Sequence, residues 1–221
     1  MVKENLLAVK QTLKNNIKLV AVSKYQPMES LVEAYEAGQR VFGESHALEV
    51  RDKAEALPKD IEWHFIGHLQ TNKVKYIAPF ISCIQSVDSL KLMQEINKQA
   101  LKNDRVIDCL LQFHVAQEET KSGFTLEECE AVLSSEEFAS LQNIRIVGVM
   151  GMATYTEDEK QIRKEFKSLV SIFAYLKMAY FSTNIDFKEI SMGMTDDYQI
   201  AMSEGSTIVR VGSGIFGERG Y

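Results

Sequence analysis

A lysine directly follows an apolar stretch of strand length near the start of the chain. Residues 17–22 read Ile-Lys-Leu-Val-Ala-Val, and Ser23 and Lys24 come next. Apolar residues on both faces are typical of a strand in a parallel sheet, and the carboxyl ends of such strands form the binding crevice of α/β folds. A lysine beside buried apolar surface is a nucleophilic amine that can form a Schiff base. The alternative is a lysine whose stem packs on the rim while its ammonium group reaches water.

Two glycine-containing segments late in the chain are suited to binding an anion. Residues 191–195 read Ser-Met-Gly-Met-Thr, and residues 212–217 read Gly-Ser-Gly-Ile-Phe-Gly. Loops after the last strands of a barrel often bind phosphate, because glycines let backbone N–H groups approach the anion. The alternative for each segment is ordinary turn chemistry. The second segment also matches G-x-G-x-x-G, but only four residues follow it, too few to open the helix of a dinucleotide-binding unit.

An arginine lies just before the second of these segments. Arg210 alternates with Ile208 along a predicted strand, so a regular strand in a barrel would point it inward, where a buried cation needs a partner. One interpretation makes it a donor to an aromatic nitrogen or an anion of a bound ligand. The other makes it a rim residue in a salt bridge with Glu44 or Glu218. The residues alone favour neither.

The other polar and sulfur-containing groups favour structural roles. His64 and His68 are four residues apart, but we place them at a strand end and its loop, where this spacing does not converge on one metal ion. The Asp196–Asp197 pair is predicted in the first turn of a helix, where the macrodipole stabilises acidic charge, and not as an acid and base pair. Three methionines are interpreted as core residues: Met192, Met194 and Met202.

Segments of strand length alternate with helical patterns along the whole chain. We expect strands within 17–22, 41–44, 61–66, 81–87, 106–115, 144–150, 187–190 and 207–211. Helical patterns are expected at 2–15, from 28 to Gly38, at 46–55, 71–76, from Asp88 or Ser89 to 103, and at 126–133, 157–180 and 196–203. The first of these precedes the strands, and each later one follows a strand.

This order predicts an α/β fold: a single (β/α)8 TIM barrel with an extra N-terminal helix, formed by residues 1–221 as one domain. An open doubly wound sheet is the competing architecture. The barrel is favoured because polar or glycine residues follow nearly every strand, as expected of a ring of loops around one mouth. They include Lys24, Glu44, His68, Ser86, His114, Gly151, Ser191 and Arg210.

Composition excludes several classes of protein. The 221 residues carry a net charge of −6, so there is no basic excess for a general nucleic-acid binder. The three cysteines are widely spaced and odd in number, which indicates a reducing compartment and neither a disulfide framework nor a thiolate zinc site. The N-terminus is too polar for a signal peptide, and no apolar span reaches membrane length. We therefore expect a soluble, cytoplasmic protein with no membrane or nucleic-acid partner.

The motifs taken together resemble one family. The sequence resembles the pyridoxal phosphate homeostasis proteins of the YggS/PROSC type. The matching segments span nearly the whole chain in order, and together they are highly specific. They are 19–24, 42–44, 63–73, 121–123, 148–150, 191–197 and 210–217.

The resemblance implies a barrel like the N-terminal domain of alanine racemase that binds pyridoxal 5′-phosphate (PLP). It implies that Lys24 holds PLP as a Schiff base and that Arg210 faces the pyridine nitrogen. It also implies that the phosphate is held by Ser191, Gly212 and Ser213, with backbone groups around Met192. The chain departs from the family at Ser45, because the family usually has Phe-Gly-Glu-Asn where this chain has Phe-Gly-Glu-Ser, so the contact of that asparagine is in doubt.

The sequence then predicts a protein that carries or buffers PLP and helps maintain PLP and amino-acid pools without strong turnover. An arginine stays protonated, so one facing the pyridine nitrogen weakens the ring as an electron sink. The chain ends four residues after its last loop glycine, without the second domain of alanine racemases, and a monomer is expected. Apo forms of PLP-dependent enzymes are the expected recipients.

Two enzymes are the alternatives. One is a PLP-dependent amino-acid racemase or lyase that uses His68 or Tyr155 as its second base. The other is a cofactor-free Schiff-base aldolase, suggested by a barrel lysine beside a phosphate site. Such aldolases usually carry the lysine on a late strand, whereas Lys24 follows the first.

Overall fold

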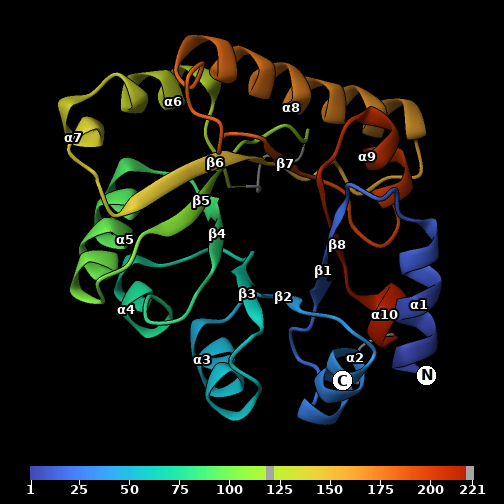
Figure 1. Ribbon diagram of the computed structural model, residues 1–221. Coiled ribbons are helices and arrows are strands. Elements are labelled where there is room, and N and C mark those ends of the chain that lie inside the picture. Colours follow the sequence, from blue (N-terminus) through green and yellow to red (C-terminus); the bar gives the residue numbers. More distant parts are fainter. Residues whose placement is uncertain (118–121, 218–221) are drawn as a thin grey trace.

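Eight parallel strands close into one barrel, in chain order, with the last strand paired to the first (Figure 1). The computed structural model describes residues 1–117 and 122–217. The strands are β1 Lys18–Val22, β2 Val41–Glu44, β3 Glu62–Phe65, β4 Cys83–Val87, β5 Ile107–Gln112, β6 Ile144–Met150, β7 Glu189–Ser191 and β8 Ile208–Val211. The predicted (β/α)8 barrel is confirmed, and the open doubly wound sheet is excluded because β1 pairs with β8 from Lys18 to Ala21.

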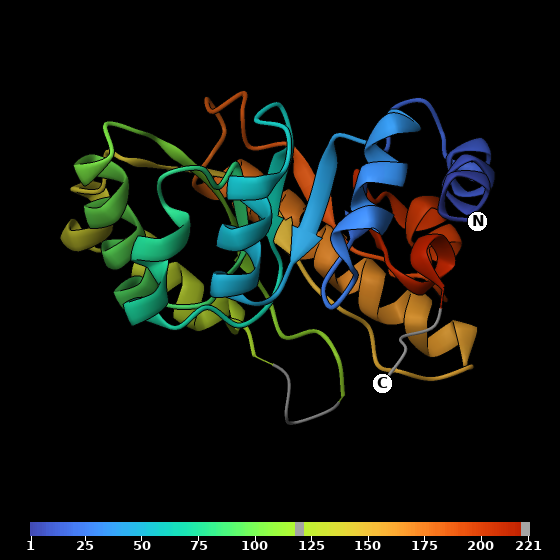
Figure 2. The same ribbon diagram turned by 90° about the horizontal axis from the view of Figure 1, so that it is seen from below.

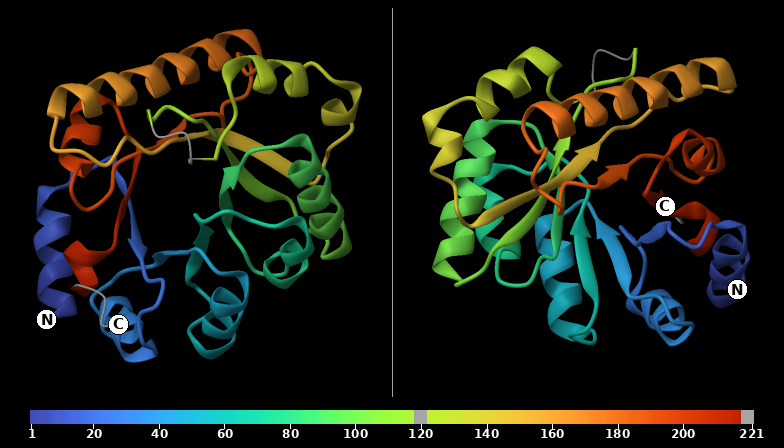
Figure 3. Two further views of the ribbon diagram at one scale, coloured as in Figure 1. Left: turned by 180° about the vertical axis from the view of Figure 1, so that it is seen from behind. Right: turned by 45° about the horizontal axis from the view of Figure 1, so that its top comes forward.

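The helices surround the barrel on the outside (Figures 2 and 3). They are α1 Val2–Thr12, α2 Met28–Glu36, α3 Ala47–Ala56, the 3-10 turn η1 Thr71–Lys73, α4 Val74–Ile77, α5 Leu90–Lys102, α6 Leu126–Leu133, α7 Glu136–Ala139, α8 Glu159–Ala179, α9 Tyr198–Glu204 and α10 Ser213–Phe216. The long α8 lies across β6 and β7 in Figure 1. The predicted extra N-terminal helix is α1, which lies beside α10, and Asn5 Nδ2 donates to Ile215 O at 3.1 Å.

Local sequence signals set the ends of several helices. Ser89, one of the two predicted caps of α5, accepts a hydrogen bond from the N–H of Leu92. Thr125 and Glu128 form a reciprocal capping box at the start of α6. Gly38, the predicted end of this helix, follows α2 with a φ of +87°, the left-handed conformation in which glycine commonly ends a helix. The short α7 was not predicted, although Ser135 caps it by accepting from the N–H of Phe138.

The strands are apolar on both faces because they separate two hydrophobic clusters. Leu19 and Ala21 belong to the large cluster between the barrel and the helices, whereas Val20 belongs to a smaller one. Side chains alternate along a strand, so this smaller cluster fills the barrel interior. Its members are Val20, Cys83, Leu110, Val147, Met150 and Ile208. The interpretation of residues 17–22 as a strand covered on both faces is confirmed.

Residues 1–117 and 122–217 contain neither a helix that could span a membrane nor a cluster of metal ligands. Within these ranges, no helix combines the length and the apolar character needed to span a bilayer. Within the same ranges, His, Cys, Asp and Glu residues form no group of three or more that could hold a metal ion.

Candidate functional site

Two adjoining cavities lie at the carboxyl ends of the strands. The smaller, of about 490 Å³, is lined by residues in or directly after β1 and β8 and by residues that follow β2, β3, β6 and β7. They include Lys24, Tyr155, Met194, Thr195, Asp196, Arg210, Gly212, Ser213 and Gly217. The structure therefore brings together four of the predicted site residues: Lys24, Arg210, Gly212 and Ser213. We call this space the Arg210 cavity.

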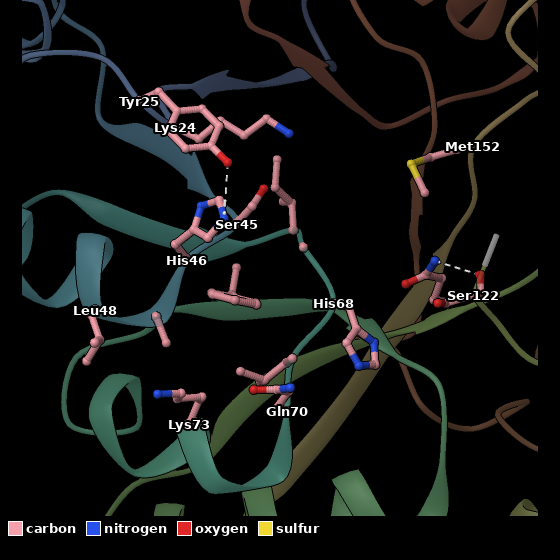
Figure 4. Close-up of a pocket in the computed structure, with 16 residues that line it drawn as sticks. Lys24, Tyr25, Ser45, His46, Leu48, His68, Gln70, Lys73, Ser122 and Met152 are labelled. Carbon is pink, nitrogen blue, oxygen red and sulfur yellow. Dashed lines mark hydrogen bonds between the residues drawn. The ribbon is translucent and has the colours of Figure 1, made fainter. Parts of the chain in front are cut away.

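The larger cavity, of about 800 Å³, opens beside the first and shares part of its wall with it (Figure 4). The shared residues are Lys24, Ser45, Ile66 and Met152. In Figure 4, Lys24, Tyr25 and His46 lie on one side of the opening, with Met152 and Ser122 opposite them. Lys24 thus stands where the two cavities meet.

Helix α3 holds the backbone on both sides of Lys24. Lys53 Nζ donates to the carbonyl oxygen of Ser23 at 2.7 Å, and Glu49 Oε1 accepts from the N–H of Tyr25 at 2.7 Å. Glu49 and Lys53 also pair with each other at 2.7 Å. Tyr25 has a φ of +64°, a conformation that is unfavourable for a bulky residue and persists only where surrounding contacts impose it. We call Glu49 and Lys53 together the α3 clamp.

A buried carboxylate supports the clamp from inside the barrel wall. Glu44 Oε1 accepts from Ser23 Oγ at 2.6 Å and from Lys53 Nζ at 2.8 Å. Burial raises the pKa of Glu44, and the ammonium group of Lys53 opposes that rise. The salt bridge considered between Arg210 and Glu44 is wrong, because Glu44 points toward α3 and pairs with Lys53. The other considered partner, Glu218, lies outside the described residues.

Arg210 is buried inside the barrel and held by two neutral oxygens. Its Nη1 donates to Ser191 Oγ at 2.6 Å, and its Nη2 donates to the carbonyl oxygen of Gly151 at 3.1 Å. Burial lowers the pKa of Arg210 to about 10, with Asp197 opposing the change, so the side chain stays cationic near neutral pH. No ion pair joins Arg210 to a carboxylate within residues 1–117 and 122–217. The guanidinium group therefore retains N–H donors for an acceptor in the Arg210 cavity.

The two glycine-containing loops meet at one hydroxyl group. Thr195 Oγ1 accepts from the N–H of Gly212 at 3.2 Å and from that of Gly214 at 3.5 Å, and Ser213 Oγ lies 3.3 Å away. Gly214 allows this close approach, because an added Cβ would lie 3.2 Å from Thr195 Cγ2. Gly193 lets its loop pack against α9: its φ is +97°, and an added Cβ would lie 2.6 Å from Ala201 Cβ. Backbone and hydroxyl donors that converge on one oxygen are the arrangement that phosphate-binding loops use.

Ser191 and Met192 do not line the Arg210 cavity in the described structure. The Ser191 hydroxyl is engaged by Arg210 and donates to Gln85 Oε1 at 2.6 Å. The N–H of Met192 donates to Ile208 O in the barrel wall, and its side chain lies in the outer core. The predicted phosphate contacts of these two residues stay predictions. Ser191 is placed to orient Arg210.

Three further predictions need correction. Met192 and Met202 are core residues as predicted, but Met194 is 37% exposed and lines the Arg210 cavity. Asp197 precedes α9 instead of lying in its first turn, and it accepts from the N–H of Met194 at 2.6 Å. His64 lies within β3, not at its end, and is buried because its side chain points into the barrel.

The two residues considered as second bases lie in different cavities. Tyr155 lines the Arg210 cavity, whereas His68 lines the larger one, where its Nδ1 is 3.7 Å from Asp88. Both side chains are mostly exposed at the rim. Ser45, the position at which the chain departs from the family, lines both cavities.

Comparisons with known proteins identify the family. The family described as alanine racemase, N-terminal domain, matches residues 1–220. A pyridoxal phosphate homeostasis protein from Aquifex aeolicus is 40% identical over 208 residues, which cover 94% of this chain and 89% of that protein. The chain belongs to the pyridoxal phosphate homeostasis protein family. A pyridoxal phosphate homeostasis protein from Haemophilus influenzae is 35% identical over 210 residues, covering 94% of this chain and 87% of that protein.

Solved structures agree with membership of the pyridoxal phosphate homeostasis protein family. PipY of Synechococcus elongatus, solved with PLP bound, is 31% identical, with a TM-score of 0.88 and coverage of 98% of this chain and 100% of that one. Alanine racemase from Bacillus anthracis is 14% identical, with a TM-score of 0.76, and the match covers 98% of this chain and 55% of the racemase. At that identity the likeness shows the fold alone. The predicted family and the alanine racemase N-terminal-like barrel are confirmed.

Sequence reasoning missed three groups in the site of this pyridoxal phosphate homeostasis family member. The α3 clamp was missed because Glu49 and Lys53 read as ordinary surface charges on a helix, although their spacing of four residues places them on one face. The Thr195 hydroxyl was recognised only as part of a loop. Gln85 is a buried amide in β4, which is itself a signal that a polar partner is near.

Proposed function

We propose that this protein binds PLP reversibly as a Schiff base on Lys24, and that it carries or buffers the cofactor for PLP and amino-acid homeostasis. One observation carries the proposal: Lys24, Arg210 and the loop residues Gly212 and Ser213 line one cavity. Family membership and the PLP-bound structure of PipY support the same cofactor.

The residues present fit PLP group by group. PLP supplies an aldehyde that condenses reversibly with a primary amine, a phosphate, and an aromatic nitrogen that accepts a hydrogen bond. Lys24 is the amine in the Arg210 cavity. Gly212, Ser213 and Thr195 line the same cavity and offer a backbone N–H group and two hydroxyls to the phosphate. The predicted contacts of Ser191 and of backbone groups around Met192 remain part of the proposal. Arg210 is the buried donor for the ring nitrogen.

The charge of Arg210 favours a carrier over an efficient enzyme. Two neutral acceptors fix its guanidinium group, and it remains cationic near neutral pH. A cation beside the ring nitrogen keeps that nitrogen unprotonated, which limits how well the ring withdraws electrons from an attached amino acid. This placement disfavours turnover, whereas reversible binding does not depend on a protonated ring.

A PLP-dependent amino-acid racemase or lyase is the second candidate function. Tyr155 and His68 stand at the rims of the two cavities that meet at Lys24, so a proton acceptor is available on each side. A chiral assay on PLP-loaded protein with several amino acids separates the candidates. Turnover that is abolished in Lys24→Ala would overturn the carrier proposal.

The proposal extends to cellular context. The protein acts in the cytoplasm as a monomer and supplies PLP to apo forms of PLP-dependent enzymes. These statements follow from the sequence predictions. Sedimentation of the purified chain and reactivation of a PLP-depleted enzyme by the loaded protein test them.

Covalent trapping tests the proposed function directly. Purified protein is mixed with PLP, its visible absorption is recorded, and borohydride reduction is followed by peptide mapping. We expect imine absorption and a reduced adduct on Lys24. Lys24→Ala should lose both, while Lys102→Ala, which changes an exposed lysine in the last turn of α5, at the end of the helix away from the mouth, should keep both. A colourless protein would contradict the proposal and favour a cofactor-free aldolase.

A further inference from the structure

A chain of hydrogen-bonded side chains runs through the barrel below the Arg210 cavity. Arg210 Nη1 donates to Ser191 Oγ at 2.6 Å, and Ser191 Oγ donates to Gln85 Oε1 at 2.6 Å. Gln85 Nε2 lies 2.8 Å from His64 Nδ1. These four residues come from β8, β7, β4 and β3, and each is at most 3% exposed. We call them the interior chain.

The direction of every bond in the interior chain follows from Arg210. A guanidinium group only donates, so the Ser191 oxygen must accept and its hydrogen must go to Gln85. Gln85 therefore presents its oxygen to Ser191 and its NH2 group to His64. His64 Nδ1 must then be an acceptor, and its hydrogen is carried by Nε2.

The far end of the interior chain reaches the opposite end of the barrel. His64 lines a cavity of about 200 Å³ together with Lys18, Glu62 and Asp108. Burial lowers the pKa of His64 to about 3, and the nearby charge of Lys18 acts in the same direction. His64 thus stays neutral near physiological pH and keeps its Nδ1 lone pair available to Gln85.

We propose that Gln85 and His64 are positioning residues that set how tightly the barrel binds PLP, because through Ser191 they fix the orientation in which Arg210 meets the ligand. The inference rests on the proposed function for its ligand. Without Gln85, the Ser191 hydroxyl loses its acceptor and can rotate away from the lone-pair geometry that Arg210 needs. The guanidinium group would then keep one fixed anchor, the carbonyl oxygen of Gly151.

A ligand-free measurement tests which atoms donate and which accept along the interior chain. Nitrogen-15 NMR of histidine-labelled protein distinguishes a protonated ring nitrogen from an unprotonated one. We expect His64 in the neutral form with hydrogen on Nε2 and none on Nδ1. In Gln85→Glu the ionised carboxylate can only accept, so hydrogen should move to Nδ1 of His64. Hydrogen on Nδ1 in the wild-type protein would overturn the proposal.

A binding measurement tests the consequence for the ligand. PLP is titrated into the wild-type protein, Ser191→Ala and Gln85→Leu. Each variant should bind roughly tenfold more weakly, the loss typical of one hydrogen bond to a charged group, and should still trap PLP on Lys24 at saturation. The matched control is Gln99→Leu, a buried glutamine on the outer helix α5, which should bind as the wild-type protein does.

The results separate the two proposals. If Gln85→Leu binds PLP as tightly as the wild-type protein, Gln85 is structural and this inference is wrong. If Gln99→Leu weakens binding as much as Gln85→Leu, the loss is a general effect of removing a buried amide and the inference is again wrong. If the wild-type protein traps no PLP on Lys24, the proposed function fails, while the NMR result still decides the direction of the interior chain.

Discussion

Mild acid should destabilise this protein through one buried histidine. The native barrel holds His64 neutral with a pKa lowered to about 3, chiefly by burial, whereas the unfolded chain binds a proton at the ordinary value of 6.5. Between these two pKa values, His64 is therefore protonated in the unfolded state and neutral in the folded state. The contribution of neutral His64 to the free energy of unfolding is therefore full above pH 6.5 and decreases progressively as the pH falls from 6.5 toward 3.

The size of this effect follows from proton linkage. With these two pKa values, the free energy of unfolding falls by about 1.3 kcal/mol between pH 7.0 and 5.5 from His64 alone. His64→Gln removes the titrating group and keeps an amide near Gln85, so this part of the pH dependence should vanish. The variant is expected to be less stable at pH 7.0 and to lose less stability on acidification.

Urea unfolding at several pH values measures the effect. Trp63, the single tryptophan, is 2% exposed in β3 and reports unfolding by fluorescence. His68→Gln is the matched control, because it removes an exposed imidazole at the rim and should keep the wild-type slope. The reasoning is refuted if the wild-type protein and His64→Gln lose equal stability between pH 7.0 and 5.5.

Two further predictions concern the loops and the clamp. Gly193→Ala should lower the free energy of unfolding by roughly 2 kcal/mol more than Gly38→Ala does. Both glycines have a positive φ, but only a Cβ at Gly193 would clash with Ala201. Equal losses in urea unfolding would contradict this packing argument. Glu49→Ala should weaken PLP binding by roughly tenfold, because Tyr25 then loses the contact that holds its backbone after Lys24. Glu29→Ala, an exposed change on α2, should have no effect in the same PLP titration, and a similar loss there would show that Glu49 is not specific.

Hydrophobic periodicity and helix-end signals were sufficient to predict most of the strands and helices from the sequence. The β6 strand was predicted with its observed bounds, 144–150, because apart from Arg145 it is a continuous apolar run that Asn143 precedes and Gly151 follows. The first strand was recognised from its two apolar faces, which a covered barrel strand requires. The short α7 was missed because four residues cannot display a helical period, so only its cap was visible in sequence.

The candidate site was predicted where residue type alone carries the chemistry. Lys24, Arg210 and Gly212 have functions that few other residues can supply, and the structure places all three on one cavity. The role of Ser191 could not be predicted, because it depends on β4 and β7 facing each other across the barrel. Met194 was misplaced since methionine is equally common in cores and at flexible rims, and only the loop geometry distinguishes the two.

Barrel closure has a consequence for the proposed uptake and release of PLP. A closed ring of eight paired strands has no unpaired edge at which it can open, so a ligand can enter and leave only at the ends of the barrel. The rate at which PLP exchanges is then set by the rim segments near residues 24, 195 and 213. The strands beneath them keep the shape of the Arg210 cavity constant. Evolution can tune delivery in those segments without altering the frame that supports them.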